Sequence, residues 1–404
     1  MNNPKSILIF GAGKIGRSFI GQLFGLAGYE VVFSDIDQNL IDLLNRHGEY
    51  RVLIKGDDEK TITISGVRAI SGLDHGSVIR EVSRSSIIAV SAGKTAVKKI
   101  IPLIAEGLLL RYKEDKNKPL DIIIAENLRS AAQFFHGELI GFLPSDYPLD
   151  ELVGLVETSI GKMVPIMKES ELALDPLAVY AESYNTLILD AKGFKGSIPK
   201  VTGLAPKENI KAWVDRKAFI HNLGHATAAY IGSLHHPGAT YIYEVLEDEH
   251  VYNTVRKVMQ EAARLLQTIY SEDFSSADLD AHIDNLLFRF KNRALQDTIF
   301  RVGRDRIRKL GADDRFMGII RLAKTLDKPY GLILEAMASA FFFRATGEQG
   351  EMFESDRLFE EYKAYGVSFI LQRVCGIDPK EDAGLIHEFQ GCYKYLNNNY
   401  NYNS

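Results

Sequence analysis

The chain has 404 residues, a length that exceeds one ordinary hydrophobic core and therefore predicts two domains. Its net charge of -5 argues against general attraction to nucleic acid or to an anionic membrane, and its hydrophobic share of 46% is that of a globular protein. The two cysteines, Cys375 and Cys392, form neither a disulfide framework nor a zinc-ligand spacing, so we expect a reducing, cytoplasmic location.

The first half of the chain alternates short apolar runs with helical patterns. A helical pattern extends to about Leu26 after the first run, and another covers residues 95–110. Strands that alternate with helices predict a parallel sheet covered on both faces, which is an α/β Rossmann-like fold. The runs that we interpret as strands are residues 7–10, 30–34, 87–90 and 122–125.

The second half of the chain is predicted to be mostly α-helical. Residues 196–206 have the glycine and proline content of a linker, and helical patterns follow at residues 208–230, 248–270, 277–290, 314–326 and 331–344. We therefore expect an NAD-binding Rossmann-like domain over residues 1–197 and a helical substrate and catalytic domain over residues 198–404. The start of the chain does not resemble a signal peptide, the apolar stretch 331–343 is too short to cross a bilayer, and the tail 397–404 is expected to be frayed.

A glycine-rich loop follows the first predicted strand and opens a helix. Gly11 permits a tight turn, Gly13 lets the backbone approach a pyrophosphate, and Gly16 lets the helix pack against the strand. The helix amino terminus offers free amides to the phosphates. The alternative is a glycine turn that binds nothing, but the strand before the loop and the helix after it favour a dinucleotide site. Its predicted residues are Gly11, Ala12, Gly13, Lys14, Ile15 and Gly16.

An acidic residue, Asp35, ends the second predicted strand at the distance from the loop that a dinucleotide fingerprint requires. A carboxylate there accepts hydrogen bonds from the adenosine ribose hydroxyls and repels a 2′-phosphate, so we expect NAD rather than NADP. Asp37 is the competing candidate, and we interpret it as a surface turn residue instead.

Lys217, Asn222 and His225 share the first helical pattern of the second domain. At ~100° per residue, His225 lies ~80° and Asn222 ~140° around an α-helix from Lys217, so the three can point into one cleft. Oxidation of an alcohol without a metal needs a base for the hydroxyl proton and donors for the oxygen. A lysine serves as that base when burial or a nearby positive charge lowers its pKa. The alternative is an ordinary solvated lysine on an amphipathic helix.

The sequence resembles the polyol-specific long-chain dehydrogenases, the mannitol dehydrogenase family, and within it the members that act on mannitol 1-phosphate. The resemblance implies Lys217 as general base, Asn127 and Asn222 as an amide pair at the alcohol oxygen, and His225 as a substrate hydrogen-bond partner. It also implies an active site between the domains and, less specifically, a monomer. The segments that carry it are residues 10–21, 125–127, 175–176 and 194–196 and the pattern Lys217-x4-Asn222-x2-His225.

A phosphorylated substrate is suggested by the arginine-dense segment 301–315, because guanidinium forks suit phosphate oxygens. The alternative is a solvated basic helix face. The segment resembles the mannitol 1-phosphate members of the family, which implies reversible oxidation of D-mannitol 1-phosphate to D-fructose 6-phosphate with NAD and no metal. The candidate phosphate contacts are Arg301, Arg304, Arg308, Lys309 and Arg315.

Departures from the family pattern keep other substrates open. Residues 161–165 read Gly-Lys-Met-Val-Pro where the family usually has Asp-Arg at the first two positions, and Lys94 replaces the usual proline. Lys94 and Lys162 are therefore weak candidates for contacts with an anion. The rival functions are a mannitol 2-dehydrogenase, a fructuronate or tagaturonate reductase, and a non-catalytic NADH-binding redox sensor. A zinc alcohol dehydrogenase is disfavoured, because cysteines are absent where zinc would need them.

Overall fold

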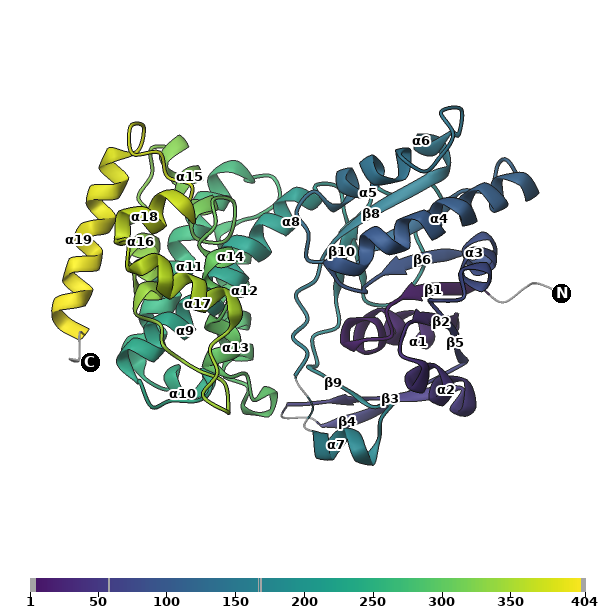
Figure 1. Cartoon of the computed structure of the whole chain (residues 1–404), viewed down its shortest axis with the longest axis horizontal. Coiled ribbons are helices and arrows are strands. Elements are labelled where there is room, and N and C mark those ends of the chain that lie inside the picture. Colours follow the sequence, from purple (N-terminus) through teal and green to yellow (C-terminus); the bar gives the residue numbers. More distant parts are fainter. Residues whose placement is uncertain (1–4, 57–58, 166, 168, 401–404) are drawn as a thin grey trace. The chain divides into compact units, whose positions relative to one another are not determined.

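The computed structural model describes residues 5–56, 59–165, 167 and 169–400 and divides into two compact units, Met1–Val214 and Asp215–Ser404. Figure 1 shows the first unit from purple to teal and the second from teal-green to yellow. The first unit is built around a sheet and the second is helical, which confirms the predicted fold class of a Rossmann-like domain followed by a mostly helical one.

The strands of the first unit form one large sheet and one small one within the described ranges. The large sheet has the order β11-β10-β8-β7-β6-β1-β2-β5, and the small one has the order β4-β3-β9. The strands are β1 (Ser6–Phe10), β2 (Glu30–Asp35), β3 (Glu49–Ile54), β4 (Lys60–Ser65), β5 (Val67–Ser71), β6 (Ile87–Val90), β7 (Leu120–Ile124), β8 (Val153–Ser159), β9 (Val179–Ala181), β10 (Leu187–Asp190) and β11 (Leu204–Lys207).

Six neighbouring strands of the large sheet, from β5 to β8, are parallel and follow the order of a dinucleotide-binding doubly wound sheet. The strand order reverses between β1 and β6, so the loops after these two strands meet at one edge. Two strands depart from the expected parallel arrangement, because β10 pairs antiparallel with β8 and β11 is parallel to β10. The sheet is therefore mixed beyond its dinucleotide-binding part.

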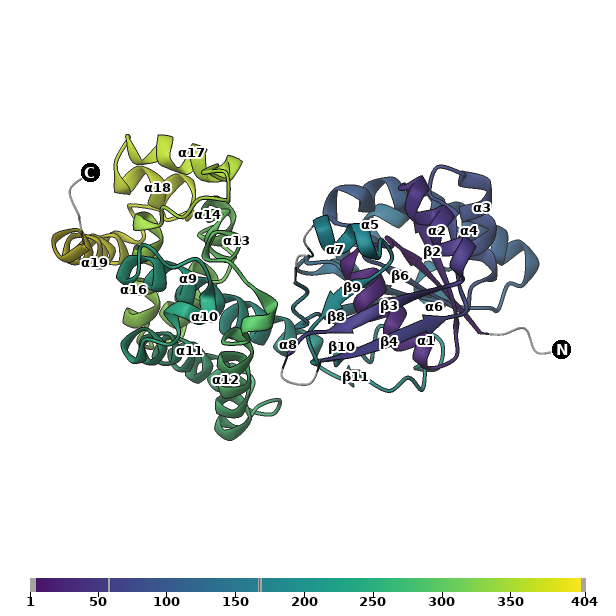
Figure 2. The ribbon, with the colours of Figure 1, turned by 90° about the horizontal axis from the view of Figure 1, so that it is seen from below.

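The two faces of the large sheet bury separate hydrophobic clusters. Ile7 and Ile9 of β1 contribute to one cluster, and Leu8 and Phe10 contribute to the other, because successive side chains of a strand point to opposite faces. Helices cover both faces, as Figure 2 shows. The helices of the first unit are η1 (Gly16–Gly21), which is a π-helix, α1 (Gln22–Leu26), α2 (Gln38–His47), α3 (His75–Arg84), α4 (Lys94–Glu114), α5 (Ala131–Ile140), α6 (Leu149–Leu152), α7 (Glu169–Leu174) and α8 (Ile210–Arg216).

The segment that we interpreted as a linker ends in structure. Residues 204–207 form β11, which pairs in parallel with β10 and carries Pro206 at the edge of the sheet, where a missing amide is tolerated. The predicted boundary after residue 197 thus precedes a strand of the first unit. The hairpin of β3 and β4 and the strand β9 have no counterpart among the predicted elements.

The second unit packs its helices around α9, whose buried face is rich in small residues. The Cβ of an alanine at Gly224 would lie 2.5 Å from the Met259 sulfur, so close approach of α11 depends on that glycine. The elements are η2 (Lys217–Asn222), which is a π-helix, α9 (Leu223–His235), α10 (Ile242–Val245), α11 (Glu249–Ile269), α12 (Ser276–Phe290), η3 (Arg293–Leu295), α13 (Ile299–Gly303), α14 (Arg306–Lys309), α15 (Met317–Thr325), α16 (Gly331–Ser339), η4 (Ala340–Phe342), α17 (Glu354–Lys363), α18 (Val367–Arg373) and α19 (Ala383–Tyr400).

The end of the chain is more ordered than the sequence suggested. Residues 397–400, predicted to be frayed, belong to α19, and the Tyr400 hydroxyl lies 3.1 Å from Nε2 of His235; residues 401–404 lie outside the described ranges. Among the described helices, none combines the length and the apolar character that a bilayer crossing requires.

Close packing of α3 against α4 gives a test of the fold. An alanine Cβ at Gly107 would lie 2.4 Å from Cβ of Val82, so Gly107→Ala must force the two helices apart. We expect a loss of roughly 1–3 kcal/mol in the free energy of unfolding, measured by urea denaturation. The control is Gly137→Ala in α5, where no atom lies within 4 Å, and where better helix propensity should stabilise the protein by up to ~1 kcal/mol. Equal stabilities of the two variants would contradict this packing.

Candidate active site

The glycine loop after β1 has the geometry that a bound dinucleotide requires. Gly11 has φ +94°, which favours glycine, and a Cβ at Gly16 would lie 2.0 Å from the Gly11 carbonyl oxygen. A Cβ at Gly13 would meet no atom within 4 Å. The first and third glycines are thus fixed by the protein itself, whereas the open side of Gly13 leaves space for a phosphate group. The residues present fit a dinucleotide at this edge of the sheet.

A buried arginine that the sequence analysis missed holds the loop. Arg17 donates from Nε to the Ala12 carbonyl at 2.7 Å and from Nη1 to the Leu177 carbonyl at 2.6 Å. Its own carbonyl accepts a hydrogen bond from the hydroxyl of Tyr50, and burial lowers the pKa of its guanidinium. Arg17 lies on η1, so the π turn and the loop are fixed together. In the sequence, this role could have been suspected only from the position of the arginine directly after the glycine motif.

Asp35 lies at the carboxyl end of β2, beside the loop. Its Oδ2 accepts a hydrogen bond from the Ala12 amide at 2.7 Å, and Oδ1 accepts from the Ile36 and Asp37 amides. The carboxylate is therefore fixed next to the loop, where an adenosine ribose would lie in a doubly wound fold. Asp37 instead caps α2, because its carboxylate accepts from the amides of Asn39 and Leu40.

Asn127 and the two departing lysines also belong to the first unit. Asn127 is exposed in the loop after β7, and its neighbour Glu126 accepts a hydrogen bond from the Gly93 amide at 2.8 Å. Lys94 is the first residue of α4 and is exposed. Lys162 is buried and donates to the side chains of Gln22 and Asn185, and burial lowers its pKa to about 7. The Lys162 amine is thus held by two amide oxygens.

Lys217 and Asn222 are the first and last residues of a π-helix, which changes the geometry assumed from the sequence. A π turn closes its hydrogen bonds at i+5 and thus holds one extra residue, so later residues are rotated back by roughly 100°. The angle from Lys217 falls from ~140° to ~40° for Asn222, and from ~80° to about -20° for His225. The three side chains therefore share one face more closely than a regular α-helix would allow.

The amine of Lys217 lies in a desolvated and positively charged environment. Burial lowers its pKa to about 8, and the charge of Arg315 acts in the same direction. Arg315 is buried and donates from Nη1 to the Asn222 carbonyl at 3.1 Å, at the end of the π-helix. A lysine with this pKa is neutral in roughly a tenth of the molecules at pH 7 and in about half at pH 8, and the neutral amine can accept a proton.

His225 is held by an acidic residue that the sequence analysis missed. Its Nε2 lies 3.0 Å from Oδ2 of Asp297, a contact that becomes an ion pair only when the ring is protonated, and its ring stacks on Phe290 at 4.5 Å. Asp297 also accepts from Nε of Arg301 at 2.7 Å. Burial lowers the pKa of His225, and the charge of Asp297 opposes that shift. One buried carboxylate therefore orients both predicted site residues.

The five candidate phosphate contacts lie in the second unit in different surroundings. Arg301 pairs with Asp297, and Arg315 pairs with Asp314 and the Asn222 carbonyl. Arg308 pairs with Asp305 and Asp314, and Lys309 is buried and donates to the carbonyls of Val302 and Arg304. Arg304 is half-buried beside the rings of Phe300 and Phe353 and has no carboxylate partner within the part of the chain that the structure describes.

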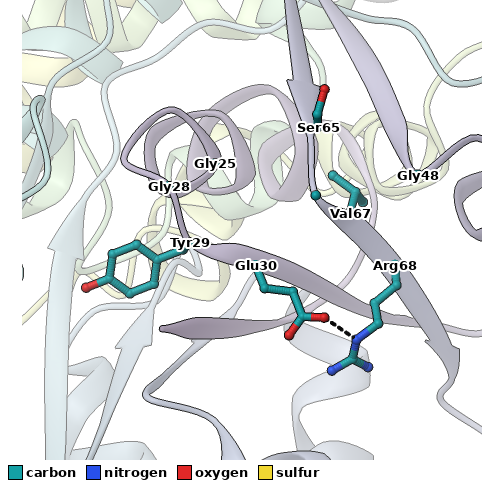
Figure 3. Close-up of a pocket in the computed structure, with 9 residues that line it drawn as sticks. Gly25, Gly28, Tyr29, Glu30, Gly48, Ser65, Val67 and Arg68 are labelled. Atoms are coloured by element: carbon teal, nitrogen blue, oxygen red, sulfur yellow. Dashed lines mark hydrogen bonds and ion pairs between the residues drawn. The ribbon is translucent and has the colours of Figure 1, made fainter. Parts of the chain in front are cut away.

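A surface pocket of about 580 Å³ opens at the other end of the sheet (Figure 3). Gly28 and Gly66 line it, and Glu30 and Arg68 form an ion pair at 2.8 Å beside it. Glu30 begins β2 whereas Asp35 ends it, so this pocket lies away from the dinucleotide edge. Across the described ranges, no group of three or more histidine, cysteine or acidic side chains is arranged to hold a metal ion.

The doubly wound sheet with its glycine loop, followed by a helical unit, defines a Rossmann-fold dehydrogenase with an appended helical domain. The chain belongs to the mannitol dehydrogenase family. The model of the mannitol dehydrogenase Rossmann domain matches residues 5–203, and that of the mannitol dehydrogenase C-terminal domain matches residues 209–372. The resemblance predicted from the sequence motifs is thereby confirmed.

Solved structures share the fold at low sequence identity. Mannitol 2-dehydrogenase from Pseudomonas fluorescens, in a ternary complex with NAD and D-mannitol, is 14% identical over 98% of this chain and 93% of its own, with a TM-score of 0.79. Yersinopine dehydrogenase with bound NADP+ is 14% identical over 97% and 100% of the two chains, with a TM-score of 0.48. The first likeness concerns the fold, and the second is too weak to support an argument.

The contact of His225 with Asp297 can be tested by titration. In Asp297→Asn the charge that raises the pKa of His225 is lost while burial remains, so the pKa should fall further below 6.5. Histidine-labelled protein would report this shift by NMR. Asp248→Asn, which removes the partner of His236, is the matched control and should leave His225 unchanged. An unaltered His225 pKa in Asp297→Asn would show that Asp297 does not act on the ring.

Proposed function

We propose that the protein is an NAD-dependent mannitol-1-phosphate 5-dehydrogenase, which interconverts D-mannitol 1-phosphate and D-fructose 6-phosphate. The observation that carries the proposal is the desolvated Lys217 beside Arg315, on one face with Asn222 and His225. A redox sensor that only bound NADH would have no use for a lysine of lowered pKa on this face. The cytoplasmic location and the monomeric state stay predictions.

NAD is the cofactor that the first unit supports. Its pyrophosphate fits the open side of Gly13, and the Asp35 carboxylate beside the Ala12 amide favours ribose hydroxyls over a 2′-phosphate. Family membership and the NAD bound to the similar mannitol 2-dehydrogenase agree with this assignment. When bound, the nicotinamide supplies the hydride acceptor.

The side chains of the second unit supply the proton chemistry. Neutral Lys217 takes the hydroxyl proton while the hydrogen on the same carbon leaves as hydride, so that the C–O single bond becomes a carbonyl. Asn222 donates a hydrogen bond to the oxygen, and His225 holds a neighbouring substrate hydroxyl. Asn127, from the first unit, is the predicted second amide at the oxygen. Fixed amide donors of this kind are worth about 3 kcal/mol of barrier, by analogy with oxyanion holes.

Arg304 is the best candidate for the substrate phosphate. The other four basic candidates contact carboxylates or backbone carbonyls, whereas Arg304 is half-buried beside two phenylalanine rings. A guanidinium without a carboxylate partner can bind a phosphate without breaking an existing ion pair. The second candidate function is oxidation of an unphosphorylated polyol, or reduction of a uronate. This second function is favoured because the other four basic candidates already contact groups of the protein, and because the chain shares its fold with a mannitol 2-dehydrogenase.

The choice of substrate is tested by NADH oxidation with fructose 6-phosphate, fructose, fructuronate and tagaturonate. We expect kcat/KM for fructose 6-phosphate to exceed that for fructose by roughly 100-fold, because a charged arginine–phosphate contact contributes about 3 kcal/mol. Arg304→Met should abolish this preference and leave the activity with fructose unchanged. Turnover confined to an unphosphorylated ketose or a uronate would refute the phosphate assignment while leaving the lysine mechanism intact.

The role of Lys217 is tested by Lys217→Ala. Loss of a general base should lower kcat by roughly 10²–10⁴-fold, and NADH affinity, measured by fluorescence titration, should stay nearly the same. Because only the neutral amine accepts a proton, oxidation by the wild type should rise as pH passes about 8. Reduction needs the protonated amine and should decline over the same range.

The matched control is Lys211→Ala, which removes an exposed lysine of α8, one segment earlier in the same helical run. It should retain wild-type turnover and pH dependence. Near-normal turnover of Lys217→Ala would overturn the proposed function, whatever the substrate.

A further inference from the structure

Arg315 was a candidate for the substrate phosphate, but its guanidinium is engaged inside the protein. It is only 8% exposed, and its Nε donates to Oδ1 of Asp314 at 2.8 Å. Its Nη1 donates to the carbonyl of Asn222 at 3.1 Å. Arg315 therefore contacts the end of the π-helix that begins at Lys217, from a segment about a hundred residues later in the chain.

The bond to Asn222 stabilises a conformation that the local sequence does not favour. A π turn is rare because it replaces regular i+4 hydrogen bonding, and a charged donor on its last carbonyl compensates part of that cost. Without the extra residue of the π turn, Asn222 would rotate away from Lys217 by roughly 100°. The guanidinium thus acts on the direction of Asn222.

The same guanidinium is the charged group that acts on the Lys217 amine. Other titratable groups near the π-helix are His225 on α9, His282 and Arg289 on α12, and Asp215 on α8, which accepts a hydrogen bond from the Tyr270 hydroxyl. The charges of His225, His282 and Arg289 act on His221, the buried ring that lies between Lys217 and His225 in the sequence. Asp314 balances Arg315 only in part, since it also pairs with Arg308.

We propose that Arg315 is a positioning residue for the catalytic helix: its hydrogen bond to the Asn222 carbonyl fixes the π turn and, with it, the directions of Lys217 and Asn222. This inference rests on the proposed function, because it assigns to Arg315 a role through Lys217. It differs from a phosphate contact, since it makes Arg315 equally important for phosphorylated and unphosphorylated substrates.

The test compares Arg315→Gln, Arg315→Lys and Arg321→Gln with the wild type in the oxidation direction across pH 6 to ~10.5, the upper end being the ordinary pKa of a lysine. Arg315→Gln should move the rising limb of kcat upward by roughly one pH unit, because a nearby like charge is lost. Arg315→Lys keeps the positive charge but loses the two-pronged guanidinium that bonds Asp314 and the Asn222 carbonyl. The pH of the rising limb should therefore stay the same, while kcat falls. Arg321→Gln is the control, because it removes an arginine of α15 that pairs with Asp313 and donates to the Gly376 carbonyl, and it should leave the limb and kcat unchanged.

The outcomes separate this inference from the proposed function. An unmoved limb in folded Arg315→Gln, or a moved limb in Arg315→Lys, overturns the role of Arg315. A rise of KM limited to the phosphorylated substrate, with no shift of the limb, shows that Arg315 is a phosphate contact instead. If Arg315→Gln does not fold, the pH profile of Arg315→Lys still tests the role of Arg315, because a moved limb in that variant contradicts it. Active Lys217→Ala would refute the proposed function itself.

Discussion

Desolvation of one lysine amine is the constraint on which the account of this protein depends. Lys217 can act as a base near neutral pH only because burial, aided by Arg315, lowers its pKa to about 8. Two carboxylates of the second unit pair with other candidate residues: Asp297 faces His225 and Arg301, and Asp314 faces Arg308 and Arg315. These acidic groups therefore orient the histidine and the arginines of the proposed site.

Both segments to which we assign a function contain a π-helix. Residues 16–21 follow the glycine loop, and residues 217–222 carry the proposed catalytic lysine and asparagine. Each is tied to a buried arginine, since Arg17 binds the loop carbonyl of Ala12, and Arg315 binds the carbonyl of Asn222. The π-helices thus occur where the direction of a side chain or of the backbone matters for the proposed function. Hydrogen bonds from charged arginines compensate part of the energetic cost of this irregular geometry.

The sequence was sufficient for features that depend on local pattern. The strands around Gly11 and Asp35 and the helical second half follow from periodicity and short motifs. The spacing of Lys217, Asn222 and His225 also indicated that they share one helical run. The sequence was not sufficient for features that depend on distant partners. A π turn has no reliable local signature, so the assumed angle of Asn222 was too large. Asp297 and Arg17 gain their roles from contacts across the fold, and β11 was hidden by the glycines and prolines around it.

The most direct measurement is the titration of the Lys217 amine in the unliganded wild-type protein. Competitive labelling with an amine reagent at a series of pH values, quantified peptide by peptide by mass spectrometry, gives the pKa of each lysine independently of turnover. The account predicts that the pKa of Lys217 is about 8. A Lys217 that titrates with the exposed lysines, near the ordinary value of 10.5, would contradict its assignment as the base.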